Sequence, residues 1–117
     1  MRLTSDSDLI ARWQEFIELV GRRRRMYTLG GSLAEVSALL TGFDNGIGPS
    51  VLSDFQEWMS DRHPEQPQLV FEALVLHEVT GDHATRLHVK DLSETENDLA
   101  VDKLLALFTL YLGERRS

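Results

Sequence analysis

Apolar residues recur at helical spacing through most of this chain, and this pattern constrains the fold more than any other feature. In the segment 5–21, one face of a helix collects Leu9, Trp13, Phe16, Ile17 and Val20. Four further segments show the same period: 32–43, 50–63, 65–81 and 93–116. The sequence therefore predicts an all-α fold, a single bundle of about five helices that spans residues 1–117 as one domain.

Two of these segments begin with a capping box, in which a serine and a glutamate three residues later satisfy each other's backbone amides. The pairs are Ser32 with Glu35 and Ser93 with Glu96. The segment 65–81 is apolar nearly all round, which predicts a place at the centre of the bundle. Residues 84–91 carry a short alternation of apolar and polar side chains, which predicts an extended connection or a hairpin.

The chain has 117 residues and a net charge of −7, and its acids are unevenly distributed. Between Asp44 and Asp102 there are thirteen acidic residues and only three basic ones. This region argues against nucleic acid as a partner, because phosphate binding depends on Lys and Arg. It is compatible either with a basic protein surface as the partner or with an acidic surface that only keeps the protein soluble. The chain has no cysteine, which excludes disulfides, and no apolar run long enough for a membrane span. We therefore expect a cytoplasmic protein that binds neither nucleic acid nor membrane.

The segment from Thr41 to Ser50, TGFDNGIGPS, contains DNGIG, which is similar to the glycine box of the ATPases that include sensor histidine kinases and gyrases. In those ATPases the box follows a buried strand, and an upstream asparagine serves magnesium. Here it follows an amphipathic helix, and no asparagine precedes Asn45. Asn45 and Gly46 tolerate the left-handed backbone that ends helices, so we expect this segment to end a helix rather than to bind nucleotide.

The other candidate motifs also have structural explanations. The run from Arg22 to Arg25 stands at a helix end, where cations oppose the negative pole; it could instead pair with the chain's own acids or contact a partner. His77, His83 and His88 would make a metal site only if a turn brought them together, and their spacing matches no known signature. No nucleophile-elbow pattern occurs. We therefore expect no catalytic residue, no metal and no cofactor.

A more specific pattern lies in RRRRMYTLGGSLAEVSALLTGFDNGIG, which starts at Arg22. It resembles a group of small bacterial proteins with the pattern Arg-Pro-x-Met-Tyr, then glycine and Ser-Leu, a helix, and Gly-Tyr or Gly-Phe. Those proteins are often immunity partners encoded beside polymorphic or contact-delivered toxins. The matching positions are Arg24, Met26, Tyr27, Gly30 or Gly31, Ser32, Leu33, Leu40, Gly42 and Phe43, and further on Leu52, Phe55 and Trp58. Arg25 stands where the proline of the pattern would be.

These observations leave three hypotheses for the function. The first is an immunity protein, as the resemblance implies, that neutralises a cognate toxin with a basic surface through acidic residues. The acids expected to bind are Asp54, Glu57 and Asp61 in the third helical segment, and then Glu94, Glu96, Asp98 and Asp102 in the fifth. The second is a regulatory or adaptor domain without catalytic activity, with a homodimer formed through the apolar fifth segment. The third is an enzyme or metal protein that uses the histidines.

Overall fold

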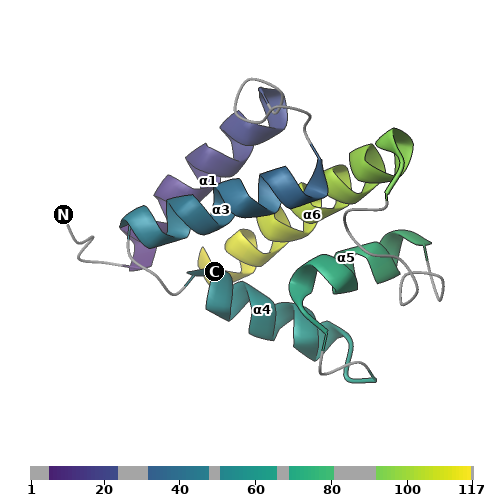
Figure 1. Cartoon of the computed structure of the whole chain (residues 1–117). Coiled ribbons are helices and arrows are strands. Elements are labelled where there is room, and N and C mark those ends of the chain that lie inside the picture. Colours follow the sequence, from purple (N-terminus) through teal and green to yellow (C-terminus); the bar gives the residue numbers. More distant parts are fainter. Residues whose placement is uncertain (1–5, 24–31, 48–50, 66–68, 81–91, 117) are drawn as a thin grey trace.

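The computed structural model describes residues 6–23, 32–47, 51–65, 69–80 and 92–116, and these segments form five helices (Figure 1). The helices are α1 (Asp6–Arg22), α3 (Leu33–Ile47), α4 (Val51–Arg62), α5 (Phe71–Thr80) and α6 (Glu94–Arg116). The described part of the chain contains no strand, so the prediction of an all-α bundle of about five helices is confirmed. Residues 84–91, for which the sequence predicts an extended segment, lie outside the described residues.

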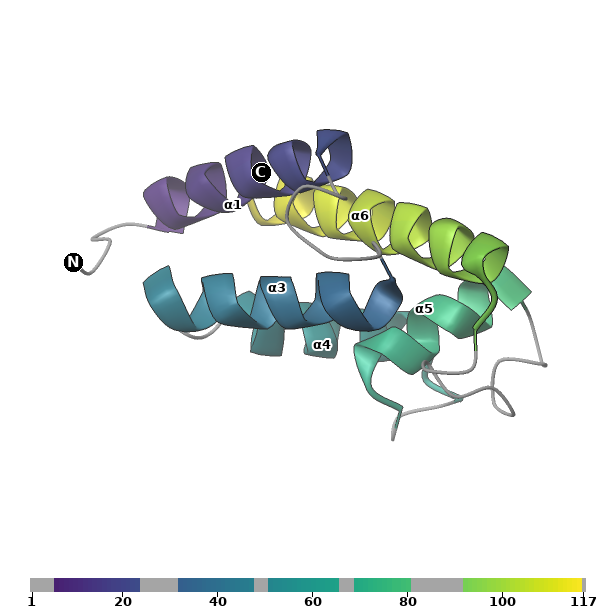
Figure 2. The same ribbon diagram turned by 45° about the horizontal axis from the view of Figure 1, so that its top comes forward.

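Helix α6 occupies the centre of the bundle and packs against each of the other four helices. In Figure 2, α1 and α6 run side by side as an upper layer, and α3, α4 and α5 lie beneath them. The segment 65–81, predicted for the centre, forms the shorter α5 instead, which packs mainly on α4 and α6. The 23 residues of α6 extend for about 34 Å, which lets this helix contact all four others. The ten residues of α5 form a much shorter helix.

Aromatic rings from four helices form the middle of the core. Trp13 of α1 is fully buried and stacks on Phe108 of α6, with ring centroids 5.0 Å apart. Phe43 of α3 meets the edge of Trp13 at 4.8 Å, and Phe55 of α4 lies 4.4 Å from Phe108. Because large aromatic side chains bury much apolar surface in defined geometries, this cluster fixes how α1, α3, α4 and α6 sit against one another.

Both predicted capping boxes are confirmed. At the start of α3 the Glu35 amide donates to Ser32 Oγ at 3.2 Å, and the Ser32 amide donates to Glu35 Oε1 at 3.3 Å. At the start of α6 the Glu96 amide donates to Ser93 Oγ at 3.1 Å, and the Ser93 amide donates to Glu96 Oε1 at 2.9 Å. The two starts are also joined, because the Leu33 amide donates to Asn97 Oδ1 at 2.8 Å.

The DNGI part of the glycine-box segment is helical, because α3 continues through it to Ile47 instead of ending near Phe43. The carboxylate of Asp44 is buried and accepts hydrogen bonds from the amides of Val51 and Leu52, at 3.1 and 3.3 Å. These amides begin α4 and have no partner within their own helix. Asp44 therefore links the end of α3 to the start of α4.

None of the described helices is long and apolar enough to cross a bilayer.

Candidate functional site

A shallow hollow with a volume of about 300 Å³ lies between α4 and the C-terminal part of α6. Its lining carries four carboxylates, two aromatic rings and one guanidinium, and we call it the acidic hollow. The lining residues are Asp54, Glu57, Trp58, Asp61, Tyr111, Glu114 and Arg115. The hollow thus contains the three α4 acids that the sequence singles out, together with α6 residues that the sequence does not indicate.

The amphipathic pattern of α4 places these acids on one side of the helix. Asp54, Glu57 and Asp61 recur at spacings of three and four residues, so they share a face. The opposite side of α4 is buried in the core through Val51, Leu52, Phe55 and Met59. Glu57 and Asp61 are exposed, and within the described segments neither carboxylate takes part in a hydrogen bond or ion pair. They are therefore available to an external cation.

Asp54 has partners inside the molecule. Tyr111 Oη donates a hydrogen bond to Asp54 Oδ2 at 2.6 Å, and Arg115 Nε forms an ion pair with the same oxygen at 3.2 Å. Burial, and then the hydrogen bond to Asp54, raise the pKa of Tyr111 well above its ordinary value of 10.0. The phenol is thus protonated at neutral pH and holds Asp54 in place. Asp54 serves the fold as well as the hollow, unlike Glu57 and Asp61.

Trp58 forms the aromatic floor of the hollow, and its ring is held from several sides. Its Nε1 donates to Glu114 Oε1 at 3.1 Å, and its ring lies 5.8 Å from that of Tyr111. The guanidinium carbon of Arg62 lies 5.0 Å from the centre of the Trp58 ring, in cation–π contact. Because Trp58 already accepts one guanidinium and is surrounded by carboxylates, the site has the chemistry that recognises a second basic side chain.

The second group of predicted acids lies at the other end of α6. It comprises Glu94, Glu96, Asp98 and Asp102. Asp98 and Tyr111 are thirteen residues apart on one helix, which corresponds to about 20 Å along its axis. Glu96 is already part of the Ser93 capping box. The structure therefore does not bring the two acidic groups into one surface, and only the α4 group surrounds a hollow.

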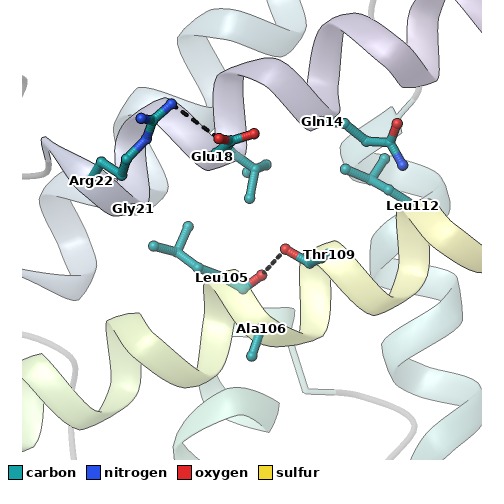
Figure 3. A pocket seen from close by; sticks show the side chains of 9 residues that line it. Gln14, Glu18, Gly21, Arg22, Leu105, Ala106, Thr109 and Leu112 are labelled. Atoms are coloured by element: carbon teal, nitrogen blue, oxygen red, sulfur yellow. Dashed lines mark hydrogen bonds and ion pairs between the residues drawn. The ribbon is translucent and has the colours of Figure 1, made fainter.

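A larger and less polar groove runs between α1 and α6 (Figure 3), and we call it the α1–α6 groove. It has a volume of about 780 Å³, and its lining residues are Gln14, Ile17, Glu18, Gly21, Arg22, Leu105, Ala106, Thr109 and Leu112. Figure 3 shows the ion pair between Arg22 and Glu18, 3.0 Å long, on the α1 side of the groove. The α1–α6 groove is larger than the acidic hollow, but it is the weaker candidate for a binding site, because it offers few charged or aromatic groups to a ligand.

The arginine run is described only as far as Arg23, and Arg24 and Arg25 lie outside the described residues. Arg22 is in the last turn of α1 and pairs with Glu18 one turn earlier. This agrees with the interpretation that cations here stabilise the helix end and pair with the chain's own acids. The pair is exposed, so it contributes little to stability.

The histidines form a cluster that the sequence pattern does not reveal. His83 and His88 lie outside the described residues, so the predicted set with His77 is not described. His77 instead lies beside His63 and Glu65, and one ligand atom from each of the three lies within 4.8 Å of the others. The sequence pattern does not indicate this pairing, because His63 follows the end of α4 and His77 lies within α5, fourteen positions later.

No protein-family model, curated protein or solved structure matches this chain. The likeness to small bacterial immunity proteins therefore stays a prediction. Of the positions that carry it, Leu33, Leu40, Leu52 and Phe55 are buried in the core. The pattern thus describes how the helices pack, and the acidic hollow supplies the separate observation on which a function can be argued.

Proposed function

We propose that this protein is a non-catalytic, protein-binding module that neutralises a cognate bacterial toxin by covering a basic surface with its acidic hollow. The observation that carries the proposal is that Glu57 and Asp61 are exposed and line the same hollow as Trp58 and the Tyr111 and Asp54 pair. The resemblance to immunity proteins supports the kind of partner. We place this binding in the cytoplasm, and neither nucleic acid nor membrane is part of the proposal.

The hollow suits a lysine or arginine side chain from the partner. Trp58 offers an aromatic surface, and tryptophan, tyrosine and arginine are the residues that most often dominate the energy of protein interfaces. The carboxylates of Glu57 and Asp61 would meet the charged end of the incoming side chain. Since Asp54 is already held by Tyr111 and Arg115, it would keep its position during binding and lose little conformational freedom.

Charge also predicts how binding depends on salt. The net charge of −7 attracts a cationic partner over a distance of roughly one Debye length, about 8 Å at physiological ionic strength. Toxins that cut nucleic acid need cationic clefts, so an acidic protein that covers such a cleft associates quickly at low salt and more slowly at high salt. The association rate is therefore the most direct measure of the proposal.

The test begins with affinity capture from a lysate of the native host, with washes at low and high salt. Three baits are compared: the wild type, the double variant Glu57→Lys with Asp61→Lys, and the control Glu15→Lys, which changes an exposed acid on α1. A partner retained by the wild type and the control is then purified for kinetics. We expect the double variant to associate at least about tenfold more slowly at low salt.

The captured partner must also prove toxic. Expressed alone in a heterologous host it should arrest growth, and co-expression of the wild type should restore growth, whereas the double variant should restore it less well. Unchanged association by the double variant would remove the acidic hollow from the proposal. A partner that is harmless on its own would exclude the immunity function, even if the hollow binds it.

The second candidate function is a regulatory or adaptor module that forms a homodimer, and the exposed side of α6 favours it. Leu99 and Leu110 are 53% and 48% exposed and stand eleven residues apart, close to three full turns, so they share a face. The α1–α6 groove lies beside this helix. Light scattering over a range of concentrations distinguishes the two candidates: a dimer lost in Leu110→Lys favours the module, and a monomer at all concentrations opposes it.

A further inference from the structure

Three potential metal ligands meet where α4 ends and α5 passes over it. His63 and Glu65 follow the last residue of α4, and His77 lies in the second half of α5. One ligand atom from each residue lies within 4.8 Å of the other two. None of these residues lines the acidic hollow or the α1–α6 groove, so the cluster is separate from both.

The spacing of His63 and Glu65 already matches that of two ligands on one metal ion. Tetrahedral zinc binds histidine nitrogen and carboxylate oxygen at about 2.0–2.2 Å, which separates two ligand atoms by about 3.4 Å. His63 Nδ1 and Glu65 Oε1 are 3.3 Å apart. Without a metal the same distance is a hydrogen bond or an ion pair, so geometry at this edge serves either state without rearrangement.

The other nitrogen of His63 has the partner that metal-bound histidines usually have. His63 Nε2 lies 2.7 Å from Glu78 Oε2, and both side chains are largely buried, 12% and 10% exposed. Metal-ligating histidines commonly donate their second ring N–H to a carboxylate, which fixes the ring and leaves the first nitrogen with its lone pair. With a metal bound, this contact requires the proton on Nε2, and His63 Nδ1, which then shares no proton with Glu65, is the ligand atom.

Glu78 is itself held firmly. Arg62 donates two hydrogen bonds to it, from Nε to Oε2 at 3.2 Å and from a terminal nitrogen to Oε1 at 3.1 Å, and Lys103 Nζ lies 3.8 Å away. These contacts fix the carboxylate of Glu78, which can therefore orient the ring of His63.

His77 completes the set and carries an unsatisfied polar atom. Its ring lies 5.4 Å from the ring of His63, at an angle of 85° between the ring planes. Its Nδ1 is buried and has no hydrogen-bond partner among the described residues. Buried nitrogens without a partner are rare in folded proteins and call for an explanation, such as an unseen ion.

We propose that His63, Glu65 and His77 form a binding site for a divalent first-row transition-metal ion such as Zn²⁺, with Glu78 as the positioning residue for His63. Three protein ligands leave a fourth tetrahedral position for water or for a group from a partner. Two imidazoles and one carboxylate favour zinc and its transition-metal neighbours over Mg²⁺ and Ca²⁺, which prefer oxygen ligands. The site is independent of the function proposed above.

Metal binding requires only a small closure of the cluster. The ligand atoms all lie within 4.8 Å of one another and would be about 3.4 Å apart on a tetrahedral ion. Glu65 can adjust its own distances to the ion, because its side chain is 59% exposed and stands outside the helices. His63, in contrast, is held by Glu78 and keeps its position.

The experiment is a calorimetric titration of tag-free, chelator-treated protein with ZnCl₂, because a histidine tag would itself bind the ion. We expect one saturable site with micromolar or tighter affinity. Each of His63→Gln, Glu65→Gln and His77→Gln should weaken it at least about tenfold, and Glu78→Gln by about 10- to 100-fold. The matched control Glu15→Gln removes an exposed carboxylate from α1, away from this cluster, and should bind Zn²⁺ like the wild type.

Circular dichroism of each variant without metal shows whether that variant folds. If a histidine variant does not fold, Glu65→Gln still tests the site, because Glu65 is exposed and its replacement should not disturb folding. Co²⁺ serves as a spectroscopic probe, and tetrahedral absorption bands that disappear in His63→Gln support the proposed ligands. Zn²⁺ affinity that is unchanged in Glu65→Gln and His63→Gln would overturn the site. Equal affinity for Mg²⁺ would overturn it as well, because it would indicate only a cluster of negative charge.

Discussion

The acids at the helix starts and the acids around the acidic hollow have different partners. Asp44 and Glu96 accept hydrogen bonds from backbone amides, at the starts of α4 and α6 respectively. Glu57 and Asp61 instead stand exposed on the α4 face beside Trp58. Folding explains the first pair, because helix starts need acceptors and favour negative charge. It does not explain the second pair, for which we propose the binding role instead.

Asp54 shares features of both groups of acids, so the charge of a residue does not by itself show whether that residue serves folding or binding. It belongs to the first turn of α4 and lines the hollow, yet Tyr111 and Arg115 already bind its carboxylate. An acid with internal partners contributes shape and order to a site. An acid without them contributes the charge that a partner meets. The stability of variants at these positions should therefore separate the two groups.

The largest effect is expected for Asp44→Ala, which removes the buried acceptor of the Val51 and Leu52 amides. Losing a charged acceptor from two buried donors should lower the free energy of unfolding by about 2–3 kcal/mol. Chemical denaturation followed by circular dichroism measures this. The control is Asn45→Ala, at the neighbouring exposed position, which should change stability by less than about 0.5 kcal/mol. Equal stability of both variants would show that Asp44 does not hold the start of α4.

A smaller loss is expected for Asn97→Ala, which removes the bond between the starts of α3 and α6. The Leu33 amide would lose its 2.8 Å acceptor in a partly buried place, so we expect a loss of about 1–2 kcal/mol in the same measurement. Thr95→Ala alters an exposed residue in the same turn of α6 and serves as the control. If both variants have the same free energy of unfolding as the wild type, the capping box of α3 is sufficient to hold the start of that helix.

Tyr111→Phe should cost about 1 kcal/mol at neutral pH, because it removes the hydrogen bond to Asp54. The effect should also depend on pH. Since folding raises the pKa of Tyr111, the contribution of its phenol is complete below pH 10.0 and declines as the pH rises above that value. The difference in unfolding free energy between wild type and variant should therefore shrink in alkaline solution.

Phenolate absorbance provides the check on that assignment. The chain has two tyrosines, so Tyr27→Phe leaves Tyr111 as the only one that titrates. In that variant we expect phenolate to form only well above pH 10.0, together with unfolding. Ionisation near the ordinary value in a folded protein would contradict the strong hydrogen bond to Asp54.

The smallest effect on stability is expected for the double variant Glu57→Lys with Asp61→Lys. Both residues are exposed, so the free energy of unfolding should change by less than about 0.5 kcal/mol. The same variant is expected to slow association with the partner, and this combination separates the two groups of acids most sharply. A loss of stability comparable to that of Asp44→Ala would place Glu57 and Asp61 among the acids that serve the fold.

The helices and their starts could be predicted because their causes lie close together in the sequence. A helical period and a capping box involve side chains three or four residues apart, as for Ser93 and Glu96. The acidic face of α4 follows from the same spacing. The extent of α3 could not be predicted this way, because Asp44 stabilises the next helix seven residues on and so keeps the DNGI residues helical.

The sequence by itself thus determined the helical class, the capping boxes and the line of acids on α4, all of which depend on local spacing. The tertiary structure decided which acids face solvent and which face the chain's own amides. It also decided that α6 is central, that His63 meets His77 and that Asn97 holds the start of α3, sixty-four residues earlier. These contacts follow from the packing of whole helices, which depends on every buried side chain at once.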